Sequence, residues 1–166
     1  VVKNDNTPLR STPVDGGLNR ISHLFKGTTV LIDGSKGEFY RVYLSKDKTG
    51  WIAKKDVDED CGINSDVASF INMDSQKFKN AVIQTISFTK NLPYTVEDLD
   101  KEILFKVYNP ELSDTSVYTL NIPKPEKYFY SVTLKDGLYT FKVCEIPKAL
   151  EDCTIVIDAG PVSYTH

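Results

Sequence analysis

The chain has 166 residues, of which 40% are hydrophobic and 26% are charged, values typical of a folded protein of one or two small domains. The formal net charge is −3, and basic residues are scattered among acidic ones, which argues against a general affinity for nucleic acids. No apolar run approaches the roughly 20 residues that a membrane-spanning helix needs. The chain begins in a polar segment, so we expect that any secretory leader is missing from this sequence.

Residues 1–25 predict a loop followed by one short element. The first 17 residues are dense in proline, glycine and polar residues, a composition typical of an irregular segment. Apolar residues recur between positions 18 and 25 at spacings that fit one or two helical turns, but that also fit a bulged strand. In either case we expect Leu18 and Ile21 to pack onto the domain that follows.

Residues 26–57 predict a small antiparallel β unit. It contains three short runs that are rich in β-branched and aromatic residues and are separated by glycine, aspartate and serine. At Gly50 we expect the backbone to bend so that the large ring of Trp51 can cross the unit. Nothing in this stretch has the composition of a reaction centre. The three expected strands span residues 28–33, 39–44 and 50–53.

Residues 58–76 have a different character and predict a linker. Acidic residues and turn formers dominate, and residues 67–73 fit a short helix within it. Asp56, Asp58 and Asp60 have the spacing of the first ligands of a calcium-binding loop, but no glutamate closes a loop of about twelve residues. A solvated linker is therefore the prediction.

The chain from Lys77 onward predicts a series of antiparallel strands. Ile103, Phe105 and Val107 alternate with other residues, the pattern of a strand with one buried face. The pair Asp136-Gly137 separates two further runs and is a signal for a type I′ hairpin turn. Regularly spaced strands with turn formers between them predict a β-sandwich. The expected strands are 81–89, 94–97, 102–108, 116–122, 128–135 and 138–146.

Three cysteines, Cys61, Cys144 and Cys153, lie far apart in the sequence. They form no Cys-x-x-Cys pair, so a zinc site built from them is not predicted. Two alternatives stay open. In the first, all three cysteines are free thiols, which their odd number and wide spacing favour. In the second, Cys144 and Cys153 face each other on neighbouring strands.

Four motifs in the first part of the chain resemble bacterial SH3 (SH3b) domains. They occur in the order expected of that family: NTPLRSTP at 6–13, KGTTV at 26–30, FYRV at 39–42 and TGWI at 49–52. A phenylalanine stands at position 39, where the family has tryptophan. The resemblance implies a small barrel of five or six strands that works as a binding module, most often on peptidoglycan or another cell-wall polymer.

The second part of the chain resembles the AMIN-type region of bacterial N-acetylmuramoyl-L-alanine amidases. LPYTV at 92–96 and ILFKVYNP at 103–110 carry this resemblance. LEDCTIVIDAG at 150–160 then resembles the opening of the zinc-dependent amidase domain. In that family the next residue is a zinc-binding histidine, but here it is Pro161, which offers no metal ligand.

Together these patterns predict an all-β fold, with an SH3b-like barrel followed by an AMIN-like β-sandwich. We expect the barrel at 1–58, a linker at 59–76 and the sandwich at 77–153. Residues 154–166 are expected to be the truncated start of an amidase-like domain or a tail.

The chain itself is not expected to be an enzyme. A catalytic zinc needs about three protein ligands and an open position. The two histidines, His23 and His166, are far apart, and His23 is expected to be a surface or packing residue. The resemblance implies that zinc, and hydrolysis of the amide between N-acetylmuramic acid and L-alanine, belong to the catalytic domain of a parent enzyme. For this chain we expect no cofactor.

Binding is therefore the function that the sequence predicts. Sugar or peptide ligands need aromatic faces and polar groups that fix their orientation. Trp51 is also a candidate core residue, and strand alternation places Tyr40 on the face opposite Arg41. The candidate ligand-binding residues are Arg10, Tyr40, Arg41, Tyr43 and Trp51.

Three tyrosines of the second domain, Tyr128, Tyr130 and Tyr139, offer a further aromatic surface. They either line an exposed sheet face or pack across the hairpin that carries them, and cross-strand packing is the preferred interpretation.

The expected role is to hold an amidase against peptidoglycan during cell-wall turnover, through its glycan or its stem peptide, outside the cell or in the cell envelope. A protein-interaction or autoinhibitory module that acts on the parent catalytic domain is the alternative. A spacer without a ligand is a third.

Overall fold

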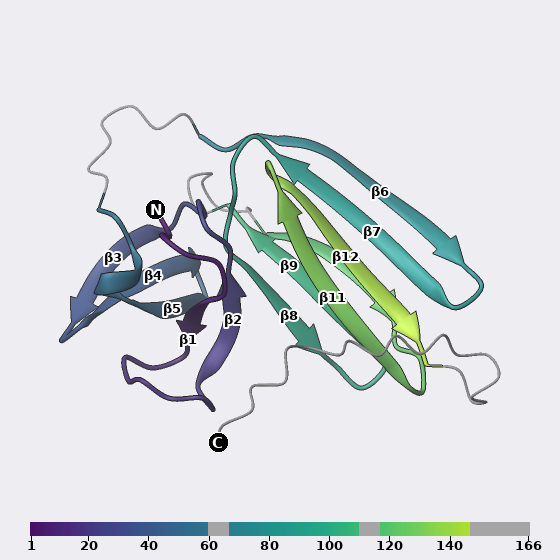
Figure 1. The fold of residues 1–166 in the computed structure, drawn as a ribbon, viewed down its shortest axis with the longest axis horizontal. Coiled ribbons are helices and arrows are strands. Elements are labelled where there is room, and N and C mark those ends of the chain that lie inside the picture. The colour runs from purple at the N-terminus through teal and green to yellow at the C-terminus, as the bar shows by residue number, and fades with distance from the viewer. Residues whose placement is uncertain (60–66, 110–116, 147–166) are drawn as a thin grey trace, which may run out of the picture.

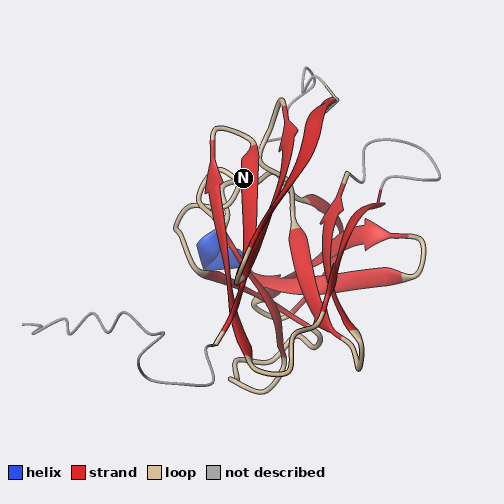
Figure 2. Ribbon diagram, turned by 90° about the vertical axis from the view of Figure 1, so that its right-hand side faces the viewer, coloured by secondary structure: helices blue, strands red, loops and turns tan. Residues whose placement is uncertain are grey.

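The computed structural model describes residues 1–59, 67–109 and 117–146, and strands make up most of them (Figure 1). A short 3₁₀ helix, η1 (Lys54–Asp56), interrupts the strands of the described chain (Figure 2). The prediction of an all-β protein is confirmed. The strands form one sheet in the N-terminal unit (residues 1–58) and two in the second unit, which we call the sandwich.

The sheet of the N-terminal unit has five strands in the order β2-β1-β5-β4-β3. Neighbouring strands run antiparallel, but β2 and β3 at its two ends do not pair with each other within the described residues. Strand pairing therefore leaves this sheet open rather than closing it into a barrel. The strands are β1 (Thr7–Arg10), β2 (Arg20–Leu24), β3 (Leu31–Lys36), β4 (Phe39–Ser45) and β5 (Lys48–Ala53).

Side-chain alternation gives this sheet one buried face. Val42, Leu44 and Ile52 are fully buried, together with Leu9 of β1 and Leu24 of β2. Burial of large aliphatic side chains contributes about 1.5–3 kcal/mol each, so this small cluster supplies much of the stability of the unit.

Gly50 permits close packing of Leu9, whereas the sequence predicted that it would make room for the ring of Trp51. A Cβ atom at this position would lie 2.7 Å from Leu9 Cδ1, on the buried face of the sheet. Trp51, the next residue, points to the opposite face because side chains alternate along a strand. The glycine therefore makes room for Leu9 rather than for the ring of Trp51.

The region before β3 differs from its prediction in two details. Residues 20–24 form a strand, which settles the choice between helix and strand, and its pairing with β1 contains a bulge next to Arg10. Leu18 is fully exposed, so the expectation that it packs onto the unit is wrong, whereas Ile21 does pack against the core. The next strand begins at Leu31, three residues later than predicted.

The sandwich consists of a three-stranded sheet, β10-β9-β8, and a four-stranded sheet, β11-β12-β7-β6. Side chains from both sheets share one buried cluster, as a sandwich requires. The strands are β6 (Phe70–Phe78), β7 (Ala81–Phe88), β8 (Tyr94–Asp98), β9 (Glu102–Tyr108), β10 (Val117–Pro123), β11 (Tyr128–Lys135) and β12 (Leu138–Glu145).

Aromatic rings fill the sandwich core. Phe105 stacks on Phe141 with their centroids 5.1 Å apart, and Tyr139 packs edge-on against Phe88. The hydroxyl of the fully buried Tyr139 donates a hydrogen bond to the carbonyl of Leu92 and accepts one, at 2.7 Å, from the Leu92 N–H. Its polar atom is thus satisfied inside an apolar core, which burial of a tyrosine requires.

The hairpin between β11 and β12 has the predicted turn. Asp136 has φ 49° and Gly137 has φ 78°, the two positive values of a type I′ turn. The expected burial of alternate residues in β9 is also confirmed, since Ile103, Phe105 and Val107 are fully buried.

The predicted linker at 59–76 is wrong in its second half. Residues 70–73, expected to be part of a helix, begin the nine-residue strand β6, and Ala68 is fully buried in the sandwich core. β6 pairs with β7 along its length, and this pairing outweighs the turn-forming composition of Asn72–Ser75.

Cys144 is a buried free thiol, whereas Cys61 and Cys153 lie outside the described residues. The expected amidase-like start at 154–166, with His166, also lies outside them. Across the described residues no helix is long and apolar enough to span a membrane.

Candidate functional site

The two units pack closely together, and each inserts an aromatic side chain into the other. Tyr108 of β9 is 1% exposed and belongs to the core cluster of the N-terminal unit. In the opposite direction, Phe25 packs on the sandwich core and stacks on Tyr94, with ring centroids 5.7 Å apart. Because both cores extend across the junction, the two units hold a defined relative position.

Polar contacts strengthen this junction. The N–H of Thr29 donates to the carbonyl of Asn91 at 2.9 Å. Glu97 on β8 accepts from Lys48 of the N-terminal unit and from Lys106 of β9, each at 2.6 Å. The hydrogen bonds from Lys106 and Lys48 hold the pKa of the Glu97 carboxyl below its ordinary value.

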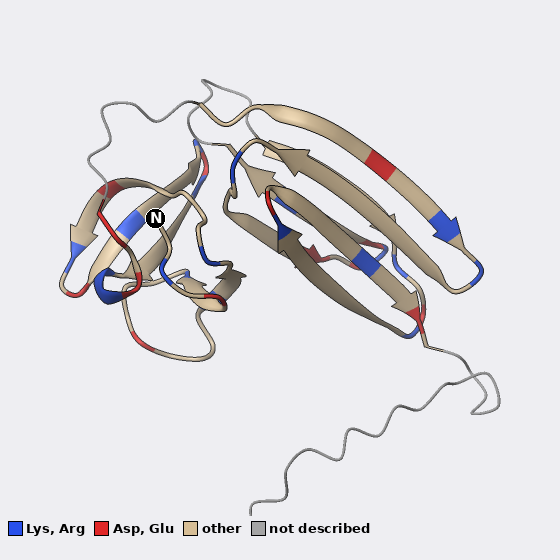
Figure 3. Ribbon diagram, turned by 45° about the horizontal axis from the view of Figure 1, so that its top comes forward, with Lys and Arg blue, Asp and Glu red and all other residues tan. Residues whose placement is uncertain are grey.

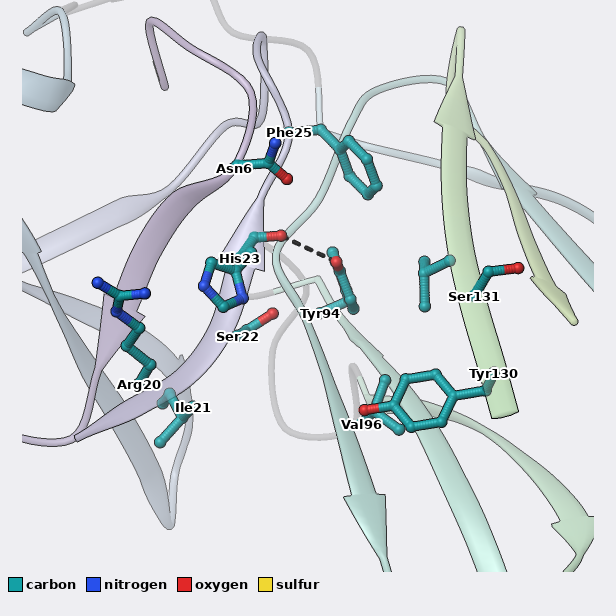
Figure 4. Close-up of a pocket in the computed structure, with 11 residues that line it drawn as sticks. Asn6, Arg20, Ile21, Ser22, His23, Phe25, Tyr94, Val96, Tyr130 and Ser131 are labelled. Carbon is teal, nitrogen blue, oxygen red and sulfur yellow. Dashed lines mark hydrogen bonds between the residues drawn. The ribbon is translucent and has the colours of Figure 1, made fainter. Parts of the chain in front are cut away.

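An open groove of about 410 Å³ lies along this junction. Its first wall is β2, and the second is formed by β8 and the inner face of the edge strand β11, as Figure 4 shows. The lining residues are Asn6, Arg20, Ile21, Ser22, His23, Phe25, Tyr94, Val96, Tyr130, Ser131 and Val132.

The two walls of the groove carry an aromatic surface and hydrogen-bond donors. Tyr130 is 44% exposed, and its ring is open to solvent on the sandwich side. Arg20 and His23 are exposed on the opposite wall. The Tyr94 hydroxyl donates to the carbonyl of His23 at 2.8 Å and ties the two walls together. An arrangement of this kind binds a ring on one side and orients its polar groups on the other.

Tyr94 has a strongly perturbed acidity. Burial disfavours its phenolate and raises its pKa to about 12. A hydrogen bond with the Ser22 side chain lowers this pKa, but by less than burial raises it. Burial also raises the pKa of Tyr139 above its ordinary value.

We therefore expect the protein to lose stability in alkali. An unfolded tyrosine titrates near pH 10, so the stabilising effect of Tyr94 and Tyr139 is complete below that pH and is lost as the pH rises toward their folded pKa values. Each of the two lowers the free energy of unfolding by about 1.4 kcal/mol per pH unit in this range. Urea unfolding between pH 9 and 11.5 measures the slope, and Tyr94→Phe should reduce it by about half. An unfolding free energy that stays constant to pH 11 would contradict the burial of both hydroxyls.

The residues predicted from the sequence lie on a different surface. Pairing across β1, β5 and β4 places Arg10, Trp51 and Arg41 in one row, because Arg10 is opposite Trp51 and Trp51 is opposite Arg41. Directly opposite residues share a face of the sheet. Tyr43, half-buried, lies on this outer face two positions from Arg41.

Both arginines of this row already have carboxylate partners. Arg10 is 6% exposed, and its guanidinium donates to Asp15 at 2.5 Å and to the carbonyl of Gly16. Arg41 donates to Asp33 at 2.8 Å, and this hydrogen bond raises its pKa. Arg10 thus fixes the loop that follows β1.

Tyr40 lies on the other face, as strand alternation predicts. It packs against the core, its hydroxyl is bonded to Glu59, and Lys54 Nζ lies 5.3 Å from the ring centroid. The hydrogen bond with Glu59 raises the pKa of Tyr40. The structure therefore brings together four of the five predicted residues and separates Tyr40 from them.

The three tyrosines of the second domain have different environments. Tyr139 is core, and the Tyr128 hydroxyl is bonded to Asp98 of the other sheet, so both pack within the sandwich but not across their own hairpin as expected. Tyr130 lines the groove. Arg20 and Ser22 had no signal in the sequence, because the groove depends on contact between β2 and β8, about 70 positions apart.

Charge does not gather on one face of the molecule. Acidic and basic residues are scattered over the ribbon in Figure 3. Among residues 1–59, 67–109 and 117–146, no three His, Cys, Asp or Glu side chains are grouped in a way that could hold a metal ion.

No protein-family model, curated protein or solved structure matches the chain.

Proposed function

We propose that this chain is a non-catalytic region of a bacterial N-acetylmuramoyl-L-alanine amidase that binds peptidoglycan. The sequence motifs support the proposal, since the SH3b-like motifs occur in the order expected of that family and the AMIN-like motifs follow them along an all-β chain. The observation that carries it is the groove at the junction, whose lining includes the exposed ring of Tyr130 on one wall and Arg20 and His23 on the other.

The groove suits a polymer of sugars and short peptides. Aromatic rings offer flat apolar faces for sugar rings, and a groove open along its length admits a chain. Such a region raises the effective concentration of a tethered catalytic domain near its substrate without adding chemistry. Hydrolysis of the amide and its zinc belong, in this proposal, to that catalytic domain, and the place of action is the cell envelope.

We expect Tyr130→Ala to weaken binding to insoluble peptidoglycan by about tenfold, because the substitution removes the exposed aromatic face of the groove. A tenfold change in affinity corresponds to about 1.4 kcal/mol of binding free energy. Co-sedimentation of the purified protein with the polymer measures the effect. Tyr43→Ala is the matched control, since it removes a tyrosine from the outer face of the other unit. Loss of binding in Tyr43→Ala but not in Tyr130→Ala would assign the ligand to the outer face instead.

A second candidate function is recognition of a partner protein, and the edge strand β6 favours it. This strand is nine residues long and exposed at every position, with Ile71, Met73 and Phe78 each more than half exposed. Within the described residues β6 pairs with β7 alone, and a free edge of this length can accept a further strand. If the wild-type protein stays in the supernatant when the peptidoglycan is pelleted, this function is favoured over the first.

A further inference from the structure

We infer that residues 154–158 of this chain pair with the outer edge of β10 and cover the core-facing side of β6. The inference goes beyond the proposed function and does not rest on it. The groove lies at the edges of the two sandwich sheets that β8 and β11 form, whereas β10 and β6 are the opposite edges.

The two sheets of the sandwich differ by one strand, and β6 is the strand without a counterpart. β9 faces β12, since Phe105 stacks on Phe141. β10 faces β7, since the Gln84 side chain donates to the carbonyl of Asn121 at 3.3 Å. Figure 1 shows β6 at the outer edge of the sandwich. The position beside β10 and opposite β6, which we call the fourth position, is occupied by no strand of the described residues.

The core-facing side of β6 is exposed at this position. Met73 is directly opposite the fully buried Ile86 of β7, so both side chains lie on the core side of the sheet. Met73 is nevertheless 55% exposed, and Lys77 on the same side is exposed as well. Only at the start of β6 does a ring of the facing sheet reach this strand, where Phe70 stacks on Tyr118 of β10. A strand at the fourth position would bury Met73.

The described chain leaves the sandwich beside the fourth position. The Glu145 N–H donates to the carbonyl of Asn80, in the turn between β6 and β7, at 2.9 Å. A small cavity of about 110 Å³ lies at this end, and its lining includes Glu145, the turn between β6 and β7, and Ile122 and Pro123 of β10. The residues that follow Ile146 therefore start between the ends of β6 and β10.

The intervening residues are long enough to reach the fourth position. Residues 147–153 span up to about 23 Å when extended. The crossing needs about 14 Å, because packed sheets lie about 10 Å apart and the fourth position is two strand spacings of about 4.8 Å beyond β9, which faces β12. β10 ends where the segment would enter, so the two strands would run antiparallel.

Residues 154–158 have the composition that this position requires. The sequence TIVID is rich in β-branched residues, which favour strands. With Ile155 and Ile157 directed at the core, alternation places Thr154, Val156 and Asp158 on the solvent side. Pro161 has no backbone N–H, so pairing would end before it.

Charge at the entrance also favours this segment. Glu151 and Asp152 immediately precede it in the sequence. Lys77 and Lys79 are exposed at the end of β6, where the segment would enter. Opposite charges at this point would guide the acidic residues past the turn and set the direction of the added strand.

The test uses NMR of the intact chain, in which Met73 is the only methionine and gives a single methyl signal. We expect a nuclear Overhauser contact between this methyl group and a methyl group of Ile155 or Ile157. We also expect amides on the outer edge of β10 to exchange with solvent at least about tenfold more slowly than in an Ile157→Asp variant. Absence of the contact, with equal exchange rates in the two proteins, would overturn the inference.

A matched pair of variants tests the direction of the side chains. Ile157→Asp should remove the contact and the protection from exchange, because it places a charge against the apolar side of β6. Val156→Asp should retain both, since this residue is assigned to the solvent side. Both substitutions lie outside the described core, so we expect unchanged circular dichroism. Loss of the contact in both variants, or in neither, would contradict the inference.

A mixture of two labelled samples tests whether the segment binds its own chain or a second copy. One sample carries the label at the Met73 methyl group and the other at the isoleucine methyl groups. We expect no contact between the two labels, and such a contact would overturn the assignment to the same chain. These measurements contain no peptidoglycan, so their failure leaves the proposed function intact, and failure of co-sedimentation leaves this inference intact.

Discussion

Tyr108→Ala is expected to lower the free energy of unfolding by about 3–5 kcal/mol, the range for removal of a large buried aromatic side chain. Tyr108 is 1% exposed and belongs to the core of the N-terminal unit, although it is part of a sandwich strand. Its hydroxyl is within 2.9 Å of Thr95 Oγ1, and Lys48 Nζ lies 5.8 Å from the ring centroid. The substitution therefore leaves a cavity and unpaired polar groups at the junction of the two units.

The same substitution tests whether the units unfold together. Trp51 is the only tryptophan of the chain and lies in the N-terminal unit, so its fluorescence reports on that unit. We expect the fluorescence and circular dichroism transitions of the wild type to coincide in urea, as in two-state unfolding. In Tyr108→Ala the fluorescence transition should occur first. A loss below about 1 kcal/mol, with coincident transitions, would contradict the insertion of Tyr108.

Gly137→Ala is expected to lower the free energy of unfolding by at least about 3 kcal/mol, or to prevent folding, because two effects add. Gly137 has φ 78°, a conformation that other residues avoid. A Cβ atom there would lie 2.0 Å from the carbonyl oxygen of Phe88. Because that oxygen belongs to the backbone, the clash can be relieved only if the turn moves. The Gly137 carbonyl also accepts from the Phe88 N–H at 3.0 Å, a bond that the shift would break.

Gly37 provides a matched control for this prediction. It too has a positive φ, 54°, but a Cβ atom at this position would have no neighbour within 4 Å. Gly37→Ala should therefore cost only the backbone strain of about 1–2 kcal/mol. Chemical denaturation of both variants measures the difference, and equal losses would show that the close contact with Phe88 is absent.

Much of the fold could be predicted from local patterns. The strand at residues 102–108 and the turn at Asp136-Gly137 were found because alternation and turn chemistry act over a few residues. The strand β6 was missed because Asn72, Asp74 and Ser75 favour turns, and its pairing with β7 is a tertiary effect that overrides this preference.

The candidate site was less accessible to sequence reasoning. Trp51 and Arg41 stood out by residue type, but whether an arginine is free to bind depends on its partner, and Asp33 becomes the partner of Arg41 only in the folded sheet. The groove brings residues of β2 next to β8 and β11, and nothing local to Arg20 or Ser22 indicates that contact. Tyr130 was identified as an aromatic candidate, but its exposure follows from its place on an edge strand.

The measurement that tests the central claim most directly is NMR mapping of the intact chain with soluble peptidoglycan fragments. We predict that backbone shift changes gather on both walls of the groove, around Ser22, Tyr94 and Ser131. Changes confined to the outer face around Arg41 and Trp51, or no changes at saturating fragment concentration, would contradict the assignment of the groove as the binding site.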